Sequence, residues 1–257
     1  MEIEFEEDDG IAHVRLNRPE KLNALTRAML ERLGEIFEAI AARRDLRAVI
    51  LSGEGDSFCA GSDIGELTSL DEEGARQRSE LGQRVCERIE TCGVPVIGAL
   101  WGVSAGGGCE LALACHLRVA SDDATFSLPE LRLGVIPAYG GTQRLALAVG
   151  RGLALSAMLA GEVISSGEAL LQNLINLVGE RELVLPAAER LARHISETTA
   201  PLAVRACLEA VTRGARLPLE EGLRLEAELF ARLFSTEDAR EGPRAFLEKR
   251  KPFFKGQ

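Results

Sequence analysis

Gly98-Ala-Leu-Trp-Gly-Val-Ser-Ala-Gly-Gly-Gly-Cys-Glu110-Leu-Ala-Leu-Ala-Cys-His116 is the stretch of sequence that decides the fold of this chain. It continues an apolar run that starts at Val94 and predicts a buried strand ending near Leu100. The consecutive glycines at 106–108 then allow the backbone to turn sharply and a ligand to approach it closely. The pattern predicts a strand, a turn and a helix N-terminus at the centre of the molecule.

The residues after the glycines predict a short apolar helix, from Cys109 to Cys115, that carries one acid, Glu110. The first N–H groups of a helix have no partner within it and favour negative charge. A carboxylate in an apolar helix is costly to bury unless it is paired or functional. We interpret the turn and Glu110 as half of a catalytic site; the alternative is a tight turn beside a narrow solvated stripe. The spacing matches neither the dinucleotide-binding fingerprint nor a P-loop.

The composition is that of an acidic globular protein. The chain has 257 residues, of which 46% are hydrophobic and 27% charged, enough for one large domain or a core with a smaller appendage. The net charge of −10 argues against nucleic acid as the main partner. The N-terminus is acidic, unlike a signal sequence, and no apolar run approaches the roughly 20 residues of a membrane helix. We therefore expect a cytoplasmic protein that binds neither nucleic acid nor membrane.

The six cysteines, at positions 59, 86, 92, 109, 115 and 207, form no C-x-x-C pair and no spacing typical of metal ligands. Most of them lie in apolar surroundings, which indicates reduced, buried thiols rather than disulfides or zinc ligands. We accordingly expect no metal site.

Turn and helix signals divide the rest of the chain. Alternating residues on either side of Asp9-Gly10 predict a β-hairpin, and Thr26 is placed to cap a helix to about residue 43. Further strands are predicted at 48–51, 117–120, 124–128 and 177–178, and further helices at 75–92, 141–149, 151–160 and after Ser165, with a loop at 65–75. From Pro186 onward the pattern is helical throughout, at 186–197, 200–212, 218–234 and 236–249.

Three segments taken together resemble the crotonase (enoyl-CoA hydratase/isomerase) superfamily, and the hydratases most closely. They are Phe58-Cys-Ala-Gly-Ser-Asp-Ile64, Gly106-Gly-Gly-Cys-Glu110, and Phe126-Ser-Leu-Pro-Glu-Leu-Arg-Leu-Gly134 running into Gly140-Gly-Thr-Gln-Arg144. Residues 18–24 and the tail from Thr236 are also similar to family segments. Each motif alone is unspecific, but their order and spacing are specific and the likeness covers nearly the whole chain.

The resemblance implies an α/β fold in which ββα units wind in a right-handed spiral. Residues 1–197 would form this spiral core with the CoA and active site, and residues 198–257 a C-terminal helical region used in trimerisation. A homo-oligomer is therefore expected, either a trimer or a dimer of trimers (a homohexamer).

The resemblance also implies the chemistry. The family binds acyl-CoA thioesters and holds the thioester oxygen between two backbone N–H groups while an enolate forms; by motif position these belong to Ser62 and Gly107. Such preorganised donors are typically worth about 2.7–4 kcal/mol each in the transition state. Because the backbone supplies the donors, the side chain of Ser62 is expected to matter little.

Two glutamates flank the substrate double bond in the hydratases, and both positions are Glu here, Glu110 and Glu130. Hydration needs one carboxylate to take a proton from water and one acid to protonate C2, and two carboxyls with different pKa values can divide that work. We expect Glu130 to deliver the α-proton and Glu110 to orient and activate the water; the alternative is a coupled pair that shares the water. For Glu130 alone, the alternative is a surface acid after Pro129.

The remaining residues carried over from the family concern CoA. Two are expected near its adenine and phosphates: Lys21 and Ala24. Four are expected at the thioester and pantetheine end: Ala60, Asp63, Ile64 and Gly65. Three in the tail are expected to reach the CoA of a neighbouring subunit, unless they are a solvated basic tail: Lys251, Phe253 and Lys255. No cofactor is implied, since coenzyme A is part of the substrate.

Three residues depart from the family pattern. Trp101 stands where Asn is common, His116 replaces a frequent Asp, and Ala138 replaces a frequent Gly. A His at a helix C-terminus is more often a dipole partner or core residue than a catalytic base, and neither His13 nor His194 has an identifiable acid or Cys partner. No catalytic triad is indicated.

These features together predict an enoyl-CoA hydratase, which adds water reversibly and with syn geometry to a 2-enoyl-CoA. The alternatives are an enoyl-CoA isomerase or other crotonase chemistry, and a non-catalytic acyl-CoA-binding paralogue. Two glutamates favour hydration, because an isomerase can shuttle a proton with one.

Overall fold

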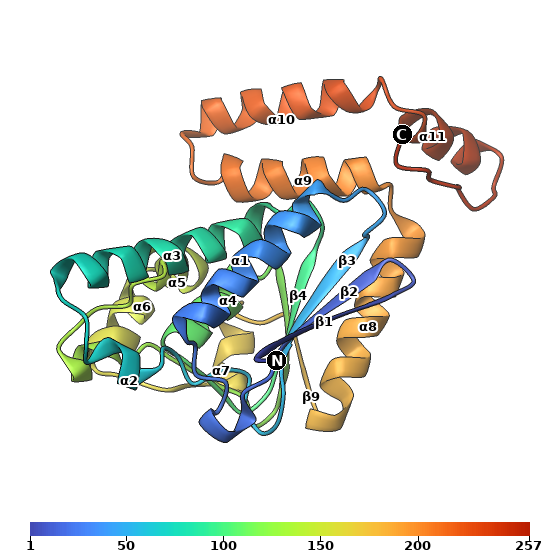
Figure 1. The fold of residues 1–257 in the computed structure, drawn as a ribbon. Helices are drawn as coiled ribbons and strands as arrows, with labels where there is room; N and C mark the ends of the chain where they lie inside the picture. The colour runs from blue at the N-terminus through green and yellow to red at the C-terminus, as the bar shows by residue number, and fades with distance from the viewer.

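Two β-sheets with helices around them make up the fold, and the computed structural model describes all residues 1–257 (Figure 1). The strands are β1 (Ile3–Asp8), β2 (Ile11–Leu16), β3 (Ala48–Gly53), β4 (Val96–Leu100), β5 (Val103–Ala105), β6 (Leu117–Ser121), β7 (Thr125–Ser127), β8 (Ile164–Ser165) and β9 (Leu177–Gly179). The helices are α1 (Arg27–Ala42), α2 (Ile64–Leu67), α3 (Glu72–Thr91), α4 (Gly107–Ala114), α5 (Gly141–Val149), α6 (Arg151–Leu159), α7 (Ser166–Leu171), α8 (Arg181–Thr198), α9 (Pro201–Gly214), α10 (Leu219–Leu233) and α11 (Asp238–Leu247). One-turn 3₁₀ helices cover Pro19–Lys21 and Glu130–Leu133.

The larger sheet has six strands in the order β1-β2-β3-β4-β6-β9. Its only antiparallel pair is the predicted hairpin, β1 with β2. Asp9 (φ 48°) and Gly10 (φ 76°) form its two-residue turn, and the left-handed backbone of both matches the twist of the flanking strands. The parallel strands that follow require crossover helices, and α1 and α3 are the first two of them.

Both faces of this sheet are covered. Along β3, Ala48 and Ile50 belong to the apolar layer that α8 covers, whereas Val49 and Leu51 belong to the main core with α1, α3 and α4. Figure 1 shows α8 on one side of the sheet and α1 and α3 on the other. Because both faces are buried, β3 reads as a continuous apolar run rather than an alternating one.

The smaller sheet has the order β5-β7-β8. The chain passes from β4 to β5, and again from β6 to β7, so that consecutive strands enter different sheets before the next helix begins. This is the ββα repeat that the resemblance implied. Strand β5 was not among the predicted strands, since its three residues, Val-Ser-Ala, are too few to establish an alternating pattern.

Two predicted boundaries were wrong. The segment 65–75 is not a loop throughout, because α2 begins at Ile64 and α3 begins at Glu72. Asp63 and Asp71 cap these two helices by accepting hydrogen bonds from backbone N–H groups of the first turn. Helix α8 begins at Arg181, before Pro186, which lies inside the helix.

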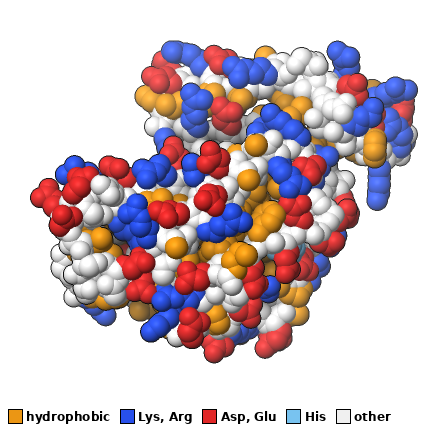
Figure 2. All heavy atoms as spheres, viewed as in Figure 1, with side chains coloured by type: hydrophobic (Ala, Val, Ile, Leu, Met, Phe, Trp, Pro, Cys, Tyr) orange, Lys and Arg blue, Asp and Glu red, His pale blue; other side chains and the backbone are white.

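The last helices extend beyond the sheets. Helix α9 packs along α10, and Figure 1 shows α10 and α11 lying away from the body of the molecule. Figure 2 shows acidic and basic side chains interspersed over the face formed by α1 and α3, rather than gathered by sign. None of the helices combines the length and the apolar character needed to cross a membrane.

Candidate active site

The centre of the candidate site is the turn into α4. Gly106, the N-cap, has φ 50° and ψ −127°, a conformation that favours glycine. A Cβ added at Gly107 would lie 2.7 Å from Cε2 of Tyr139, and one at Gly108 would meet the backbone of Cys59. Backbone conformation therefore explains Gly106, and close packing explains Gly107 and Gly108, where a side chain has no room.

The segments before Ser62 and Gly107 run side by side. Cys59 and Ser104 form a parallel bridge, in which the Cys59 N–H donates to Val103 O (3.0 Å) and the Ala105 N–H donates to Cys59 O (2.9 Å). Counting three residues onward from that bridge on each segment leads to Ser62 and to Gly107. The two residues predicted as oxyanion donors thus occupy corresponding positions on adjacent segments.

Neither of these two N–H groups is used by the protein itself. On the other side of the segment, Leu25 donates to Gly61 O and accepts from the Asp63 N–H, so the Ser62 N–H points away from Leu25. Gly107 is the first residue of α4, where an N–H has no partner within the helix. No atom of the chain accepts a hydrogen bond from either group, and both remain available for a substrate oxygen.

Glu110 lies inside the protein, with 1% of its surface exposed. Its Oε1 accepts from the N–H groups of Tyr139 (2.8 Å), in the loop before α5, and of Gly141 (2.6 Å), the first residue of α5. Burial raises the pKa of this carboxyl, and the two backbone donors oppose that rise by favouring the charged form. The alternative of a narrow solvated stripe is therefore wrong for Glu110, whereas its place in a catalytic site stays a prediction.

Glu130 begins the 3₁₀ turn that follows β7 and faces the same glycine turn. A Cβ added at Gly106 would lie 3.0 Å from its Oε1, and its Oε2 is buried without a hydrogen-bond partner. Burial raises the pKa of Glu130 to about 7, and the nearby charge of Glu110 contributes to the rise. The alternative of a solvated surface acid is therefore wrong, and a carboxyl with this pKa can give or take a proton near neutrality.

The predicted CoA residues of the N-terminal half lie beside Ser62. The loop 18–25 runs along 60–63, with the Ala60 N–H donating to Leu22 O (2.9 Å). Arg18 joins the two segments by donating to Asp63 Oδ2 (2.7 Å) and to Ala24 O (3.0 Å). Three of the predicted residues are exposed there: Lys21, Ile64 and Gly65. The structure thus brings all six together along one rim of the site.

Comparison with known proteins places this arrangement in a family. The family model described as enoyl-CoA hydratase/isomerase matches residues 6–257. The short-chain-enoyl-CoA hydratase of Clostridium acetobutylicum is 39% identical over 96% of this chain and 95% of its own length. The crotonyl-CoA hydratase of Syntrophomonas wolfei is 40% identical over 98% and 97%.

The chain belongs to the enoyl-CoA hydratase/isomerase family. Its fold agrees with that of solved members: the crystal structure of an enoyl-CoA hydratase from Bacillus anthracis superimposes with a TM-score of 0.95, at 36% identity and over 100% of both chains. The predicted fold class and the resemblance to hydratases are confirmed.

The tail residues predicted for CoA do not join the site within one chain of this family member. Lys251, Phe253 and Lys255 follow α11, which Figure 1 shows well away from α2 and α4. The Lys255 Nζ pairs with Glu237 at 3.2 Å, and 73% of the surface of Phe253 is exposed. Contact of these residues with the CoA of another subunit stays a prediction.

The residues that depart from the family pattern have structural partners. The Trp101 Nε1 donates to Gly55 O (2.9 Å), and the O of Ala138 accepts from the Ser79 hydroxyl (2.7 Å). His116 Nδ1 accepts from the Val96 N–H (2.9 Å), and burial lowers the pKa of its ring. His116 is thus a partly buried residue with structural hydrogen bonds, and it lies at the end of α4 opposite to the candidate site.

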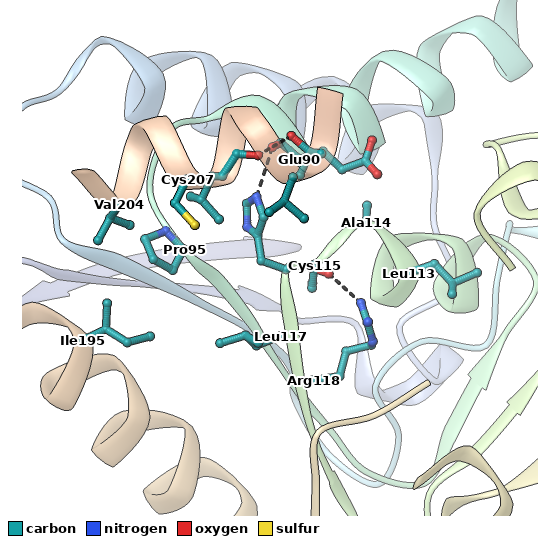
Figure 3. Close-up of a pocket in the computed structure, with 14 residues that line it drawn as sticks. Glu90, Pro95, Leu113, Ala114, Cys115, Leu117, Arg118, Ile195, Val204 and Cys207 are labelled. Carbon is teal, nitrogen blue, oxygen red and sulfur yellow. Dashed lines mark hydrogen bonds between the residues drawn. The ribbon is translucent and has the colours of Figure 1, made fainter. Parts of the chain in front are cut away.

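A cavity of about 390 Å³ lies at the C-terminal end of α4 (Figure 3), and neither Glu110 nor Glu130 lines it. Apolar side chains of α8 and α9 line one wall, and Figure 3 shows Arg118 on another, where it donates to Cys115 O. This cavity contains none of the predicted site residues. All six cysteines are free and five of them are buried, and no cluster of His, Cys, Asp or Glu is placed to hold a metal ion.

Sequence reasoning missed two residues of the site, Tyr139 and Arg78. Tyr139 is the only tyrosine of the chain and directly precedes the Gly-Gly pair at 140–141, a signal that could have marked it. Arg78 sits in a polar stretch of α3 and carries no comparable signal. The structure buries both, with 2% and 5% of their surfaces exposed.

Proposed function

We propose that the protein is an enoyl-CoA hydratase, which adds water across the C2=C3 bond of a 2-enoyl-CoA thioester to form a 3-hydroxyacyl-CoA. The observation that carries this proposal is a pair of carboxyls with raised pKa values, Glu110 and Glu130, beside two backbone N–H groups that the chain leaves unused. The hydratase names of relatives at about 40% identity support it.

The two N–H groups would bind the thioester oxygen. As the water oxygen attacks C3, negative charge moves to the thioester oxygen. The N–H groups of Ser62 and Gly107 would stabilise this charge more in the enolate than in the bound substrate. Because Gly107 opens α4, the helix dipole adds to this preference for negative charge. Interactions of this kind lower the barrier rather than only tightening binding.

The two carboxyls would divide the proton transfers. Backbone donors fix Oε1 of Glu110, which favours its carboxylate form and orients the group to accept a proton from the attacking water. Glu130, with its pKa about 7, is partly protonated near neutrality and would supply the proton that C2 receives. One proton leaves water for Glu110 and one leaves Glu130 for C2, so exchange between the carboxyls or with solvent restores the starting state. The reaction needs no metal or redox cofactor.

The proposed roles of the other residues follow from their positions. Lys21, Ala24, Ala60, Asp63, Ile64 and Gly65 would line the path of CoA along the rim beside Ser62. Residues 198–257 would assemble copies of the chain into a trimer or a dimer of trimers around the core of residues 1–197, in the cytoplasm. Large apolar side chains that this region leaves exposed support that role: Phe230, Phe234, Phe246 and Leu247. In such an assembly Lys251, Phe253 and Lys255 would reach a neighbouring CoA.

The direct test is hydration of crotonyl-CoA, followed by the loss of absorbance of the conjugated thioester. We expect turnover by the wild-type chain and a loss of about 10³-fold in Glu130→Gln, because general acid–base catalysis is typically worth 10²–10⁴-fold. The affinity for CoA, measured by calorimetry, should remain within about threefold in the variant.

Two results would overturn the proposal. Conversion of a 3-enoyl-CoA without hydration of crotonyl-CoA would make the protein an isomerase. CoA binding without turnover of either substrate would make it a non-catalytic acyl-CoA-binding paralogue.

A further inference from the structure

Tyr139 connects three parts of the candidate site. Its backbone N–H donates to Glu110, and its ring packs against the first residue of α4, where a Cβ added at Gly107 would lie 2.7 Å from Cε2. On its other side the ring fills the space left by Gly82 of α3, so that any Cβ there would overlap it. The position of this ring is therefore fixed by close packing at two opposite edges.

The hydroxyl of Tyr139 lies beside Ser62, the second residue that is expected to supply an oxyanion donor. It lies 2.8 Å from the Ser62 hydroxyl and accepts a hydrogen bond of 2.8 Å from Nε of Arg78. A guanidinium only donates, so the phenolic proton of Tyr139 is free to be donated to Oγ of Ser62. The side chain of Ser62, which we expected to matter little, is held by this bond.

Arg78 is itself held on all sides. Its two remaining nitrogens donate to Glu66 Oε2 and to Leu25 O, each at 2.7 Å. Leu25 in turn pairs with the backbone on either side of Ser62. Arg78 therefore supports Ser62 by two routes, through the segment of Leu25 and through the hydroxyl of Tyr139.

We infer that Tyr139, with Arg78 behind it, is a positioning residue that sets the Ser62 N–H relative to the Gly107 N–H so that both donate to one thioester oxygen. This rests on the proposed function. Tyr139 touches both residues that carry the donors, through its hydroxyl and through its ring. An oxyanion site depends on such placement, because a donor acts fully only at hydrogen-bond distance from the developing charge.

The test removes the hydroxyl and keeps the ring, with the variant Tyr139→Phe. We expect kcat for crotonyl-CoA to fall about tenfold, with KM within twofold, because a mispositioned donor weakens the transition state more than the bound substrate. Ser62→Ala should give a similar loss. The double variant should lose no more than either single one, since both remove the same bond.

A second readout needs no turnover. A bound 3-aryl-2-enoyl-CoA absorbs at longer wavelength when its carbonyl accepts strong hydrogen bonds, so we expect a smaller red shift in Tyr139→Phe than in the wild type. The matched control is Ser79→Ala. It removes a hydrogen bond of 2.7 Å from the Ser79 hydroxyl, on α3, to the carbonyl of Ala138, the residue before Tyr139. This control should leave kcat and the red shift unchanged.

The outcomes separate the two proposals. If the wild-type chain fails to hydrate any enoyl-CoA, the proposed function is wrong, and the red shift alone then tests whether Tyr139 positions the donors. If Tyr139→Phe keeps both the wild-type kcat and the wild-type red shift, Tyr139 is only a packing residue and the inference is overturned. Equal losses in Ser79→Ala would overturn it as well.

Discussion

The two ends of helix α4 differ in whether their polar groups have hydrogen-bond partners. At the N-terminal end, the Gly107 N–H has no partner, and Oε2 of Glu130 is buried without one. At the C-terminal end, Arg118 donates to the carbonyls of Ala112 and Cys115, and both ring nitrogens of His116 have hydrogen-bond partners.

The buried carboxyls near the two ends of α4 also differ, since those near the N-terminal end lack ion-pair partners and the one near the C-terminal end has two. Burial raises the pKa of Glu110 and of Glu130, and neither has an ion-pair partner. Burial would also raise the pKa of Glu90, at the other end, but Arg144 and Arg216 pair with it at 2.8 Å and the net effect is a lowered pKa. Polar groups without partners cost stability. Because they gather at the N-terminal end of α4, we expect a substrate bound there to supply the missing partners.

The largest effect should come from exchanging one carboxyl at each end for an amide. Glu110→Gln keeps an oxygen that can accept from Tyr139 and Gly141 but removes the charge, and kcat for crotonyl-CoA should fall about 10³-fold. Glu90→Gln should instead lower the free energy of unfolding by about 3 kcal/mol, because two arginines lose their counter-charge. Its kcat should stay within a few-fold. A similar kcat for both variants would remove the functional distinction between the two ends.

The next effect concerns the cap at the C-terminal end. Arg118→Met leaves the carbonyls of Cys115 and Leu174 without their donor, and the free energy of unfolding in urea should fall by about 2 kcal/mol. The free energy of unfolding of Arg118→Lys should lie between that of Arg118→Met and that of the wild type. The value of kcat/KM should change less than twofold, whereas a loss above tenfold would show that this end takes part in catalysis.

The smallest effect is the pH dependence of kcat/KM for hydration. Because Glu130 must hold its proton, the rate should decline as pH rises above the pKa of about 7. Because Glu110 must be ionised, the rate should also decline at low pH, below its raised pKa. The residual activity of Glu130→Gln should lack the upper decline, and persistence of that decline would assign it to another group.

Much of this molecule was predictable because its signals are local. The hairpin follows from two residues with left-handed backbone between alternating strands, and α1 begins after Thr26 because that hydroxyl caps the Met29 N–H. The one acid in the apolar stretch after three glycines marked Glu110. Its neighbours in sequence are apolar, so its burial needed no knowledge of distant segments.

What the sequence by itself determined is therefore the order of the longer helices and strands, the turn into α4 and, through the family resemblance, the identities of both glutamates. Only the tertiary structure decided which groups are left without partners and what holds them in place. Ser62 and Tyr139 are 77 residues apart in the chain, and Arg78 and Tyr139 are 61 apart. No periodicity or spacing encodes such contacts, because they depend on how α3, α4 and the loop before α5 pack around one ring. The raised pKa of Glu130 has the same origin, since it depends on burial by segments that are distant in sequence.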